Sequence, residues 1–258
     1  MVKVIVFDLD ETIGHFVQLS ILDYKLRNFN NKDLTKDKFH KILDLFPEVF
    51  RPNMINIFKY LHKMKVKNKG KIKIMIYTNN NGCRMWVNRI KSYIEKKVDA
   101  KIFDRVICAW KHDGKILEKN RTGYEKKYTD LLKCGHLKKK DEIMFLDDQL
   151  YEKMIHPRVT YLHLKPYHYK YDDKYMIHKY LKNANLSYEN TMLLAKSFNS
   201  NIPSDTYHNK FVHNKKELDK LRSKKIERNI RKFIESSYKT KKNKVKKNKT
   251  RKKAIIKI

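Results

Sequence analysis

Two aspartates separated by one residue, Asp8 and Asp10, have the spacing that most clearly indicates chemistry in this chain. They follow the apolar run 4–7, which is rich in β-branched residues and therefore predicts a buried strand. Residues two apart on an extended backbone point the same way, so the two carboxylates are expected side by side. Because like charges repel, a cation should hold them together, and the hard divalent cation Mg²⁺ prefers oxygen ligands.

Two further polar groups follow other predicted strands. Asp147 and Asp148 come directly after the strand-like run 142–146, and a second carboxylate pair at a strand end also favours a bound cation. Thr78 and Asn79 follow the run 71–77 and precede a predicted helix. A hydroxyl and free backbone N–H groups at such a position suit a phosphate oxygen, although both residues are also ordinary helix N-caps.

The elements that must position these residues alternate between strand-like and helix-like patterns. Strands that alternate with helices predict an α/β fold, with a parallel sheet covered by helices on both faces. In such sheets ligands bind beyond the carboxyl ends of the strands, which is where the polar groups lie. The predicted strands are 2–7, 71–77, 103–109, 142–146 and 159–164, and the predicted helices are 53–64, 83–96 and 124–134.

Two segments interrupt this alternation. Residues 17–50 carry helix-like apolar spacing and predict a small insert after the first strand, within a domain that spans residues 1–206. The segment 207–258 predicts a basic helix at 214–238, followed by a disordered run of Lys, Arg, Asn and Thr at 239–253. Such a tail is expected to bind nucleic acid.

Composition bears on the binding partners, the redox state of the cysteines and the location of the protein. A formal charge of +33 over 258 residues predicts attraction to polyanions, although the bias toward Lys, Asn, Ile and Tyr is also what an AT-rich genome produces, as in a large DNA virus. Cys83, Cys108 and Cys134 show no zinc-binding spacing, and reduced thiols are expected. The first strand begins at the N-terminus and no apolar run could span a membrane, so an intracellular protein, nuclear or cytoplasmic, is expected.

The order of acid pair, hydroxyl, lysine and acid pair resembles the haloacid dehalogenase (HAD) superfamily of aspartate-nucleophile phosphatases. The run 8–15, which reads DLDETIGH, is similar to the DLDETLVH motif of the branch that contains the FCP-type and NLI-interacting-factor-like phosphatases. Arg51-Pro52 matches a pair that this branch carries before its first core helix. The resemblance covers residues 1 to about 170 and implies a Rossmann-like HAD core with a five-stranded parallel sheet.

The resemblance also implies roles for the carboxylates. Asp8 would be the nucleophile and form an aspartyl-phosphate, and Asp10 would protonate the leaving alkoxide and then activate water. Asp147 would hold Mg²⁺ together with Asp8 and the backbone carbonyl of Asp10, assisted by Asp148. The family uses Mg²⁺ as its cofactor.

Thr78, Asn79 and a lysine would bind the transferring phosphoryl group. In the related branch the lysine starts a helix with apolar residues two and five positions further on. Counting from Lys126 reaches apolar residues at both positions, whereas Lys127 fits less well and Lys119 requires an earlier helix start. Lys126 is the preferred candidate, and the other two stay open.

Three functions are consistent with these residues. The branch resemblance implies a protein serine/threonine phosphatase of the type that acts on the C-terminal repeats of RNA polymerase II, with a phosphorylated protein as substrate. The same site would serve a phosphatase of nucleic-acid ends or nucleotides. A non-catalytic nucleic-acid-binding module on a HAD scaffold is the third alternative. The chain departs from the family at Ile13-Gly14, after Thr78 and at Gln149, and these departures bear on the substrate more than on the reaction.

Overall fold

The computed structural model describes residues 1–184, 186–197, 216–239 and 254–258. The chain divides into two compact units. The first, named here the sheet unit, comprises Met1–Gly14, Arg51–Tyr167 and Glu217–Ile258. The second, named the helical unit, comprises His15–Phe50 and His168–Lys216.

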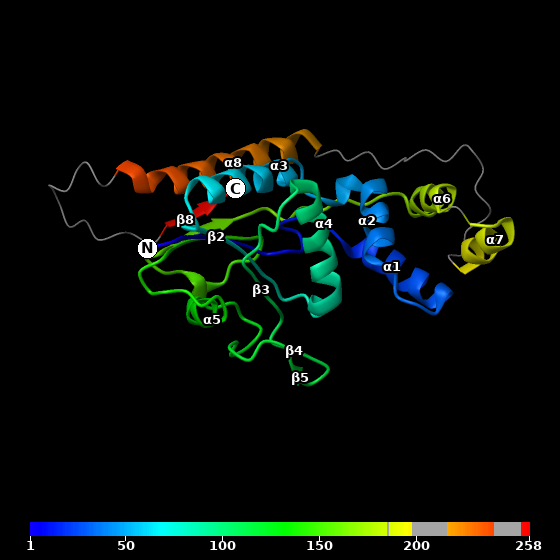
Figure 1. The fold of residues 1–258 in the computed structure, drawn as a ribbon, viewed down its shortest axis with the longest axis horizontal. Coiled ribbons are helices and arrows are strands. Elements are labelled where there is room, and N and C mark those ends of the chain that lie inside the picture. The colour runs from blue at the N-terminus through cyan, green and yellow to red at the C-terminus, as the bar shows by residue number, and fades with distance from the viewer. Residues whose placement is uncertain (185, 198–215, 240–253) are drawn as a thin grey trace. The chain divides into compact units, whose positions relative to one another are not determined.

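A six-stranded parallel sheet lies at the centre of the sheet unit, in the order β3-β2-β1-β6-β7-β8 (Figure 1). Five of these strands are the predicted ones, but the prediction of a five-stranded sheet is wrong by one strand. The sixth, β8, lies in the predicted tail segment 207–258, directly after the basic run 239–253, and its apolar centre at Ile255 and Ile256 is too short to predict a strand. The strands are β1 (Lys3–Phe7), β2 (Ile72–Tyr77), β3 (Arg105–Ile107), β6 (Glu142–Asp147), β7 (Val159–His163) and β8 (Ala254–Lys257).

The register of the sheet brings three strand ends together. β1 lies between β2 and β6, and Phe7 pairs with Ile76 on one side and with Leu146 on the other. The chain therefore leaves these three neighbouring strands at the same edge of the sheet, and the polar residues that follow them share that edge.

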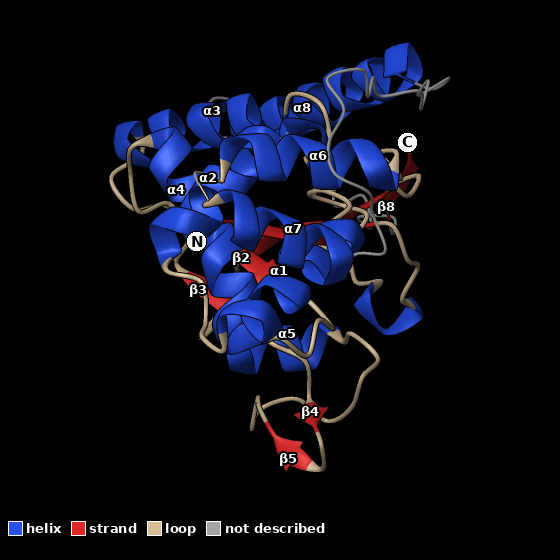
Figure 2. Cartoon of the chain, turned by 90° about the vertical axis from the view of Figure 1, so that its right-hand side faces the viewer, coloured by secondary structure: helices blue, strands red, loops and turns tan. Residues whose placement is uncertain are grey.

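Helices cover both faces of the sheet, as the alternation of elements predicts. Val4 and Val6 of β1 belong to a core that includes Leu131 of α5 (Tyr128–Cys134). Phe7 packs against Phe58 of α3 (Met54–Lys67) at 5.1 Å between ring centroids. Figure 2 shows α3 and α8 (Lys216–Lys239) on one side of the strands and α5 on the other. α4 (Asn88–Val98), preceded by a π-helical turn at Cys83–Val87, packs beside α3.

The helix α8 confirms the basic helix that the sequence predicts at 214–238, of which residues 214 and 215 lie outside the described residues. Its apolar stripe of Ile226, Ile230 and Ile234 is buried, so the helix is docked through one face. Lys3 of β1 donates to the carbonyl of Phe233 and to the hydroxyl of Ser236, which ties the second half of the helix to the sheet. The run expected to be disordered at 239–253 lies, from residue 240 onward, outside the described residues.

A short antiparallel hairpin lies between β3 and α5 and was not predicted. Its strands β4 (Lys111–His112) and β5 (Lys115–Ile116) are too short to give a period-2 pattern. Asp113 and Gly114 form the turn with φ of 48° and 74°, the left-handed geometry for which an Asp-Gly pair is suited. A single 3₁₀ turn at Glu152–Met154 follows β6.

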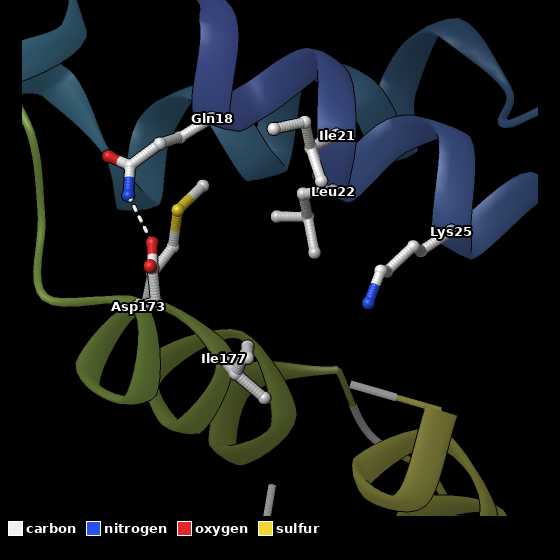
Figure 3. Close-up of a pocket in the computed structure, with 7 residues that line it drawn as sticks. Gln18, Ile21, Leu22, Lys25, Asp173 and Ile177 are labelled. Carbon is white, nitrogen blue, oxygen red and sulfur yellow. Dashed lines mark hydrogen bonds between the residues drawn. The ribbon is translucent and has the colours of Figure 1, made fainter. Parts of the chain in front are cut away.

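The helical unit contains the predicted insert and a second segment from beyond the sheet strands. Thr35 caps α2 by accepting a hydrogen bond from the backbone N–H of Lys38 at 3.3 Å. An apolar hollow between α1 and α6 is bordered by Gln18, which donates to Asp173 at 2.5 Å (Figure 3). The elements are α1 (Val17–Asn30), α2 (Lys36–Leu45), a 3₁₀ turn (Pro47–Val49), α6 (Asp173–Asn183) and α7 (Tyr188–Ser197).

The cysteines differ from expectation. Cys108 is disulfide-bonded, whereas Cys134 is a free, buried thiol. The prediction of three reduced thiols is therefore wrong, because folding brings residues together that are distant in the sequence. Among the helices in the described part of the chain, none has the length and apolar character needed to cross a membrane.

Candidate active site

Three carboxylates from two neighbouring strand ends form the centre of the site. Asp8 follows β1, Asp147 ends β6 and Asp148 comes next, and all three are buried. One carboxylate oxygen of each lies within 4.8 Å of the others. Asp8 and Asp147 meet because β1 and β6 are adjacent and in register, a long-range pairing that sequence spacing alone does not give.

A buried lysine lies between two of these carboxylates. Lys126 Nζ is 2.5 Å from Asp8 Oδ1 and 2.7 Å from Asp147 Oδ2, and the lysine is 1 % exposed. The other two candidates are elsewhere, since Lys127 donates to Thr122 Oγ1 at 2.8 Å and Lys119 is exposed. The structure thus brings Lys126, and not Lys127 or Lys119, to the carboxylates.

The charges in this cluster do not balance. Three carboxylates share one ammonium group, so the buried cluster has an excess of negative charge. Burial raises the pKa of Asp8 well above its ordinary value, and Asp147 and Asp10 raise it further against the opposing effect of Lys126. Burial likewise raises the pKa of Asp147. For Lys126, burial lowers the pKa, but the attraction of Asp8 and Asp147 outweighs this and the net shift is upward.

The turn after β1 is held by a buried arginine. Glu11 adopts a left-handed φ of 55°, a conformation that costs a non-glycine residue about 1 kcal/mol. Arg51 donates from Nη2 to the carbonyl of Glu11 at 2.6 Å and from Nε to the carbonyl of Thr12 at 2.7 Å. It also donates to the carbonyl of Lys165 at 2.9 Å. Burial lowers the pKa of Arg51 to about 10, so the guanidinium stays charged at neutral pH.

Asp10 and Thr12 extend from this turn to two other parts of the site. The amide of Asn80, in the loop after β2, donates to Asp10 Oδ2 at 3.0 Å. The hydroxyl oxygen of Thr12 accepts from the backbone N–H of Asp148 at 3.1 Å. Asp10 is not one of the three clustered carboxylates, and its expected metal contact through the backbone carbonyl stays a prediction.

The loop after β2 is held by a second buried arginine. Arg121 donates to the carbonyls of Thr78 and Cys108, at 3.0 and 2.6 Å, and to Asn79 Oδ1 at 2.6 Å. The Asn79 amide donates to the hydroxyl of Tyr151 at 3.1 Å, and the Tyr151 ring centroid is 5.3 Å from Lys126 Nζ. Asn79 is therefore linked through Tyr151 to the lysine, and Arg121 holds Thr78 and Asn79 together.

Comparisons with known proteins add little to this geometry. No protein-family model matches the chain, and no curated protein matches it. Among the solved structures similar to this chain is a HAD-superfamily hydrolase of subfamily IA, variant 1, from Geobacter sulfurreducens, with 12 % identity over 64 % of this chain and 91 % of that chain. Its TM-score of 0.36 is too low for the likeness to indicate a shared activity.

The donor set suits a hard divalent cation. Asp8, Asp147 and Asp148 offer only oxygen atoms, the ligands that Mg²⁺ prefers. A bound dication would also compensate the negative charge that Lys126 leaves unbalanced. These residues could hold Mg²⁺ on the evidence of their own chemistry, and Lys126 would remain beside them.

Sequence reasoning missed three residues that organise the site. Arg121 and Tyr151 do not occur in any short motif, and only the fold places them against the loop after β2. Asn80 directly follows Asn79 in the sequence, but its contact with Asp10 depends on β1 and β2 being neighbours. The Arg51-Pro52 pair draws attention to Arg51 in the sequence, but it does not indicate which carbonyl groups the arginine binds.

Proposed function

We propose that this chain is a Mg²⁺-dependent phosphomonoester hydrolase of the HAD type. The observation that carries the proposal is the carboxylate cluster at the ends of β1 and β6, with its excess negative charge and its buried lysine. A binding module has no need for three buried carboxylates, because their desolvation is costly unless a ligand or a reaction uses them. This argues against the non-catalytic alternative.

The nucleophile in this proposal is Asp8. Its carboxylate oxygen attacks phosphorus, the bond from phosphorus to the ester oxygen breaks, and an aspartyl-phosphate forms. When bound, Mg²⁺ would supply electrostatic shielding between the phosphate and the carboxylates and would favour the ionised form of Asp8. Asp147 and Asp148 would hold the ion together with Asp8.

Asp10 is proposed as the general acid and base. It gives its proton to the leaving alkoxide and later takes a proton from the water that hydrolyses the aspartyl-phosphate. The hydrogen bond from Asn80 to Asp10 Oδ2 helps to orient this carboxylate. The position of Asp10 two residues after Asp8, on the turn held by Arg51, supports this assignment.

Phosphoryl oxygens are proposed to be bound by Thr78, Asn79 and Lys126. The Thr78 hydroxyl oxygen accepts from the backbone N–H of Asn80 at 2.9 Å, so its own proton can be donated to a phosphoryl oxygen. Lys126 supplies a fixed positive charge where negative charge spreads in a loose transition state. Asn79 would act from a side chain held on both sides by Arg121 and Tyr151.

A phosphorylated protein is the substrate class proposed, as for the phosphatases of RNA polymerase II repeats that the motif at 8–15 resembles. A phosphatase of nucleic-acid ends or nucleotides is the alternative, favoured by the positive charge of the chain. Turnover of a phosphoserine peptide compared with a 3′-phosphorylated oligonucleotide chooses between them.

The reaction itself is tested by hydrolysis of a generic aryl phosphate. Activity is expected only with added Mg²⁺ and is expected to fall by about 10³-fold or more in Asp8→Asn. Asp113→Asn is the matched control, because Asp113 is exposed in the hairpin turn and Asn tolerates its left-handed φ. Hydrolysis that persists in Asp8→Asn, or that ignores EDTA, would refute the proposal.

A further inference from the structure

The outer surface formed by α3 and α8 in the sheet unit carries a dense positive charge that the proposed reaction does not use. α8 has basic residues every four positions, a spacing that puts them on one stripe of the helix. At 1.5 Å of rise per residue, the stripe is about 18 Å long. All four of its residues are exposed: Lys220, Lys224, Arg228 and Lys232.

The neighbouring helix repeats the pattern. α3 contains no acidic residue, and Lys59, Lys63 and Lys67 recur on it at the same four-residue spacing, all exposed. The two helices pack side by side, as Figure 1 shows and as two contacts fix. Asn53 donates to Glu227 at 2.7 Å, and the Arg231 guanidinium lies 3.8 Å from the ring centroid of Tyr60. The two basic stripes therefore flank a common outer surface, named here the α3–α8 face.

Acidic residues neutralise only part of this face, at Lys220. α8 has four in its described side chains, and three of them are already engaged. Glu217 pairs with Lys220, and Asp219 is buried against Arg222. Glu227 accepts from Asn53 and Arg231. Glu235 is the fourth, and it is exposed three residues after Lys232.

We propose that the α3–α8 face binds the sugar–phosphate backbone of a double-stranded nucleic acid. Charge complementarity favours a polyanion, and regularly spaced lysines and arginines suit the repeating phosphates of a backbone. A membrane surface fits less well, because the apolar stripe that an interfacial helix would insert is buried at Ile226, Ile230 and Ile234.

A single strand also fits less well than a duplex. Proteins that bind single strands stack the bases on exposed aromatic rings. Among the described side chains of α3 and α8, Phe58 is buried, Tyr60 lies beneath Arg231 and Phe233 lies beneath Lys3. With no exposed ring among these described side chains, contact is expected through phosphates alone, which gives binding without base-sequence preference.

The test measures binding of the full chain to a fluorescent 24-base-pair duplex of arbitrary sequence by anisotropy over a series of salt concentrations. The variant replaces Lys224, Arg228 and Lys232 by Gln. Its affinity at about 100 mM salt is expected to fall by ~10-fold or more, and the slope of log affinity against log salt to become shallower by about 2.7. Hydrolysis of the aryl phosphate should be unchanged, which shows that the variant is folded.

The matched control replaces three consecutive exposed lysines, Lys138, Lys139 and Lys140, by Gln and changes the net charge equally. It is expected to retain the affinity and the slope to within a small factor. Equal losses in both variants would show that only the net charge matters and would overturn the proposal.

Two further binding measurements test whether another part of the chain, or another ligand, accounts for the binding. If replacing Lys246, Lys247 and Lys249 abolishes binding while the α3–α8 face variant binds normally, the basic run is the binding element and the proposal is wrong. Tighter binding to a single-stranded 24-mer or to phosphatidylserine vesicles, with the same loss in the α3–α8 face variant, would likewise reject a duplex as the partner.

Discussion

The active site and the α3–α8 face are both concentrations of charge in the sheet unit, but burial makes them behave in opposite ways. At the site, Asp8, Asp147 and Lys126 are held within hydrogen-bond distance and shielded from solvent. On the α3–α8 face, basic side chains extend into water. Buried charges act through defined partners, whereas exposed charges act together through a field that salt screens.

This difference in burial means that substitutions in the two regions should have different effects. A buried charge that loses its partner keeps its full desolvation cost, and the loss is felt as instability. An exposed charge that is removed gives up a small share of a long-range attraction. Substitutions at the site should therefore change stability and turnover, and those on the face should change salt-dependent binding.

The largest effect in this comparison is expected for Lys126→Met. Without the ammonium group, Asp8 and Asp147 both lose the ion pair that holds their charge in a buried site. The free energy of unfolding without metal should fall by about 3 kcal/mol, as for other broken buried ion pairs. Thermal unfolding with and without Mg²⁺ checks this, and the ion should restore more stability to the variant than to the natural protein.

Lys153→Met is the control for that measurement. Lys153 and Glu125 form an exposed pair at 2.6 Å, so its loss should cost less than about 1 kcal/mol and should not respond to Mg²⁺. Equal effects of the two substitutions would remove the distinction between the buried and exposed charges.

The next effect concerns Arg51, whose partners are carbonyl groups. Arg51→Met leaves the carbonyls of Glu11, Thr12 and Lys165 without this donor, and we expect a loss of about 2–3 kcal/mol together with reduced turnover. Arg51→Lys should recover only part of both, because an ammonium group lacks the planar fork. Chemical denaturation and aryl phosphate hydrolysis measure the two effects.

An exposed arginine on α8 provides the contrast. Arg228→Met should change the free energy of unfolding by less than about 0.5 kcal/mol. If Arg51→Met lowers the free energy of unfolding as little as Arg228→Met does, the turn after β1 does not depend on the arginine.

The smallest effect is expected at the junction of the two basic helices. The hydrogen bonds from Arg231, and to a lesser extent from Asn53, lower the pKa of Glu227 in the folded protein. A lowered pKa stabilises the fold above the ordinary pKa of a glutamate, and this stabilisation is lost as the pH falls through the lowered value. Because the pair is partly exposed, Glu227→Gln should cost less than about 1 kcal/mol at pH 7, and the cost should shrink steadily as the pH falls below the ordinary pKa of a glutamate.

Chemical denaturation of the natural protein and of Glu227→Gln across this pH range, at low and high salt, measures the difference in their free energies of unfolding. The difference should shrink in high salt. A difference that is constant with pH would mean that the Glu227 contacts act through packing and not through charge.

Much of the sheet unit could be predicted from the sequence because its signals are local. The five runs that form β1, β2, β3, β6 and β7 are apolar over lengths typical of strands, and the helices α3 and α8 show helical spacing. The acidic residues follow β1 and end β6, so the rule that ligands bind beyond strand ends already pointed to them.

Other features could not be predicted because they depend on contacts between distant residues. The strand β8 is four residues long and pairs with β7 across more than ninety residues of sequence. The helical unit combines an insert after β1 with a segment after β7, and nothing in either segment indicates the other. The disulfide at Cys108 and the role of Arg121 as a donor to two loops belong to the same class.

The sequence by itself determined which chemical groups are available and on which side of each strand they emerge, because backbone periodicity fixes the direction of neighbouring side chains. Only the tertiary structure decided that Lys126, and not Lys127 or Lys119, lies between Asp8 and Asp147. It also decided that the basic stripes of α3 and α8 share one face. Those outcomes depend on the register of the sheet and the packing of helices, which bring together residues that no local pattern connects.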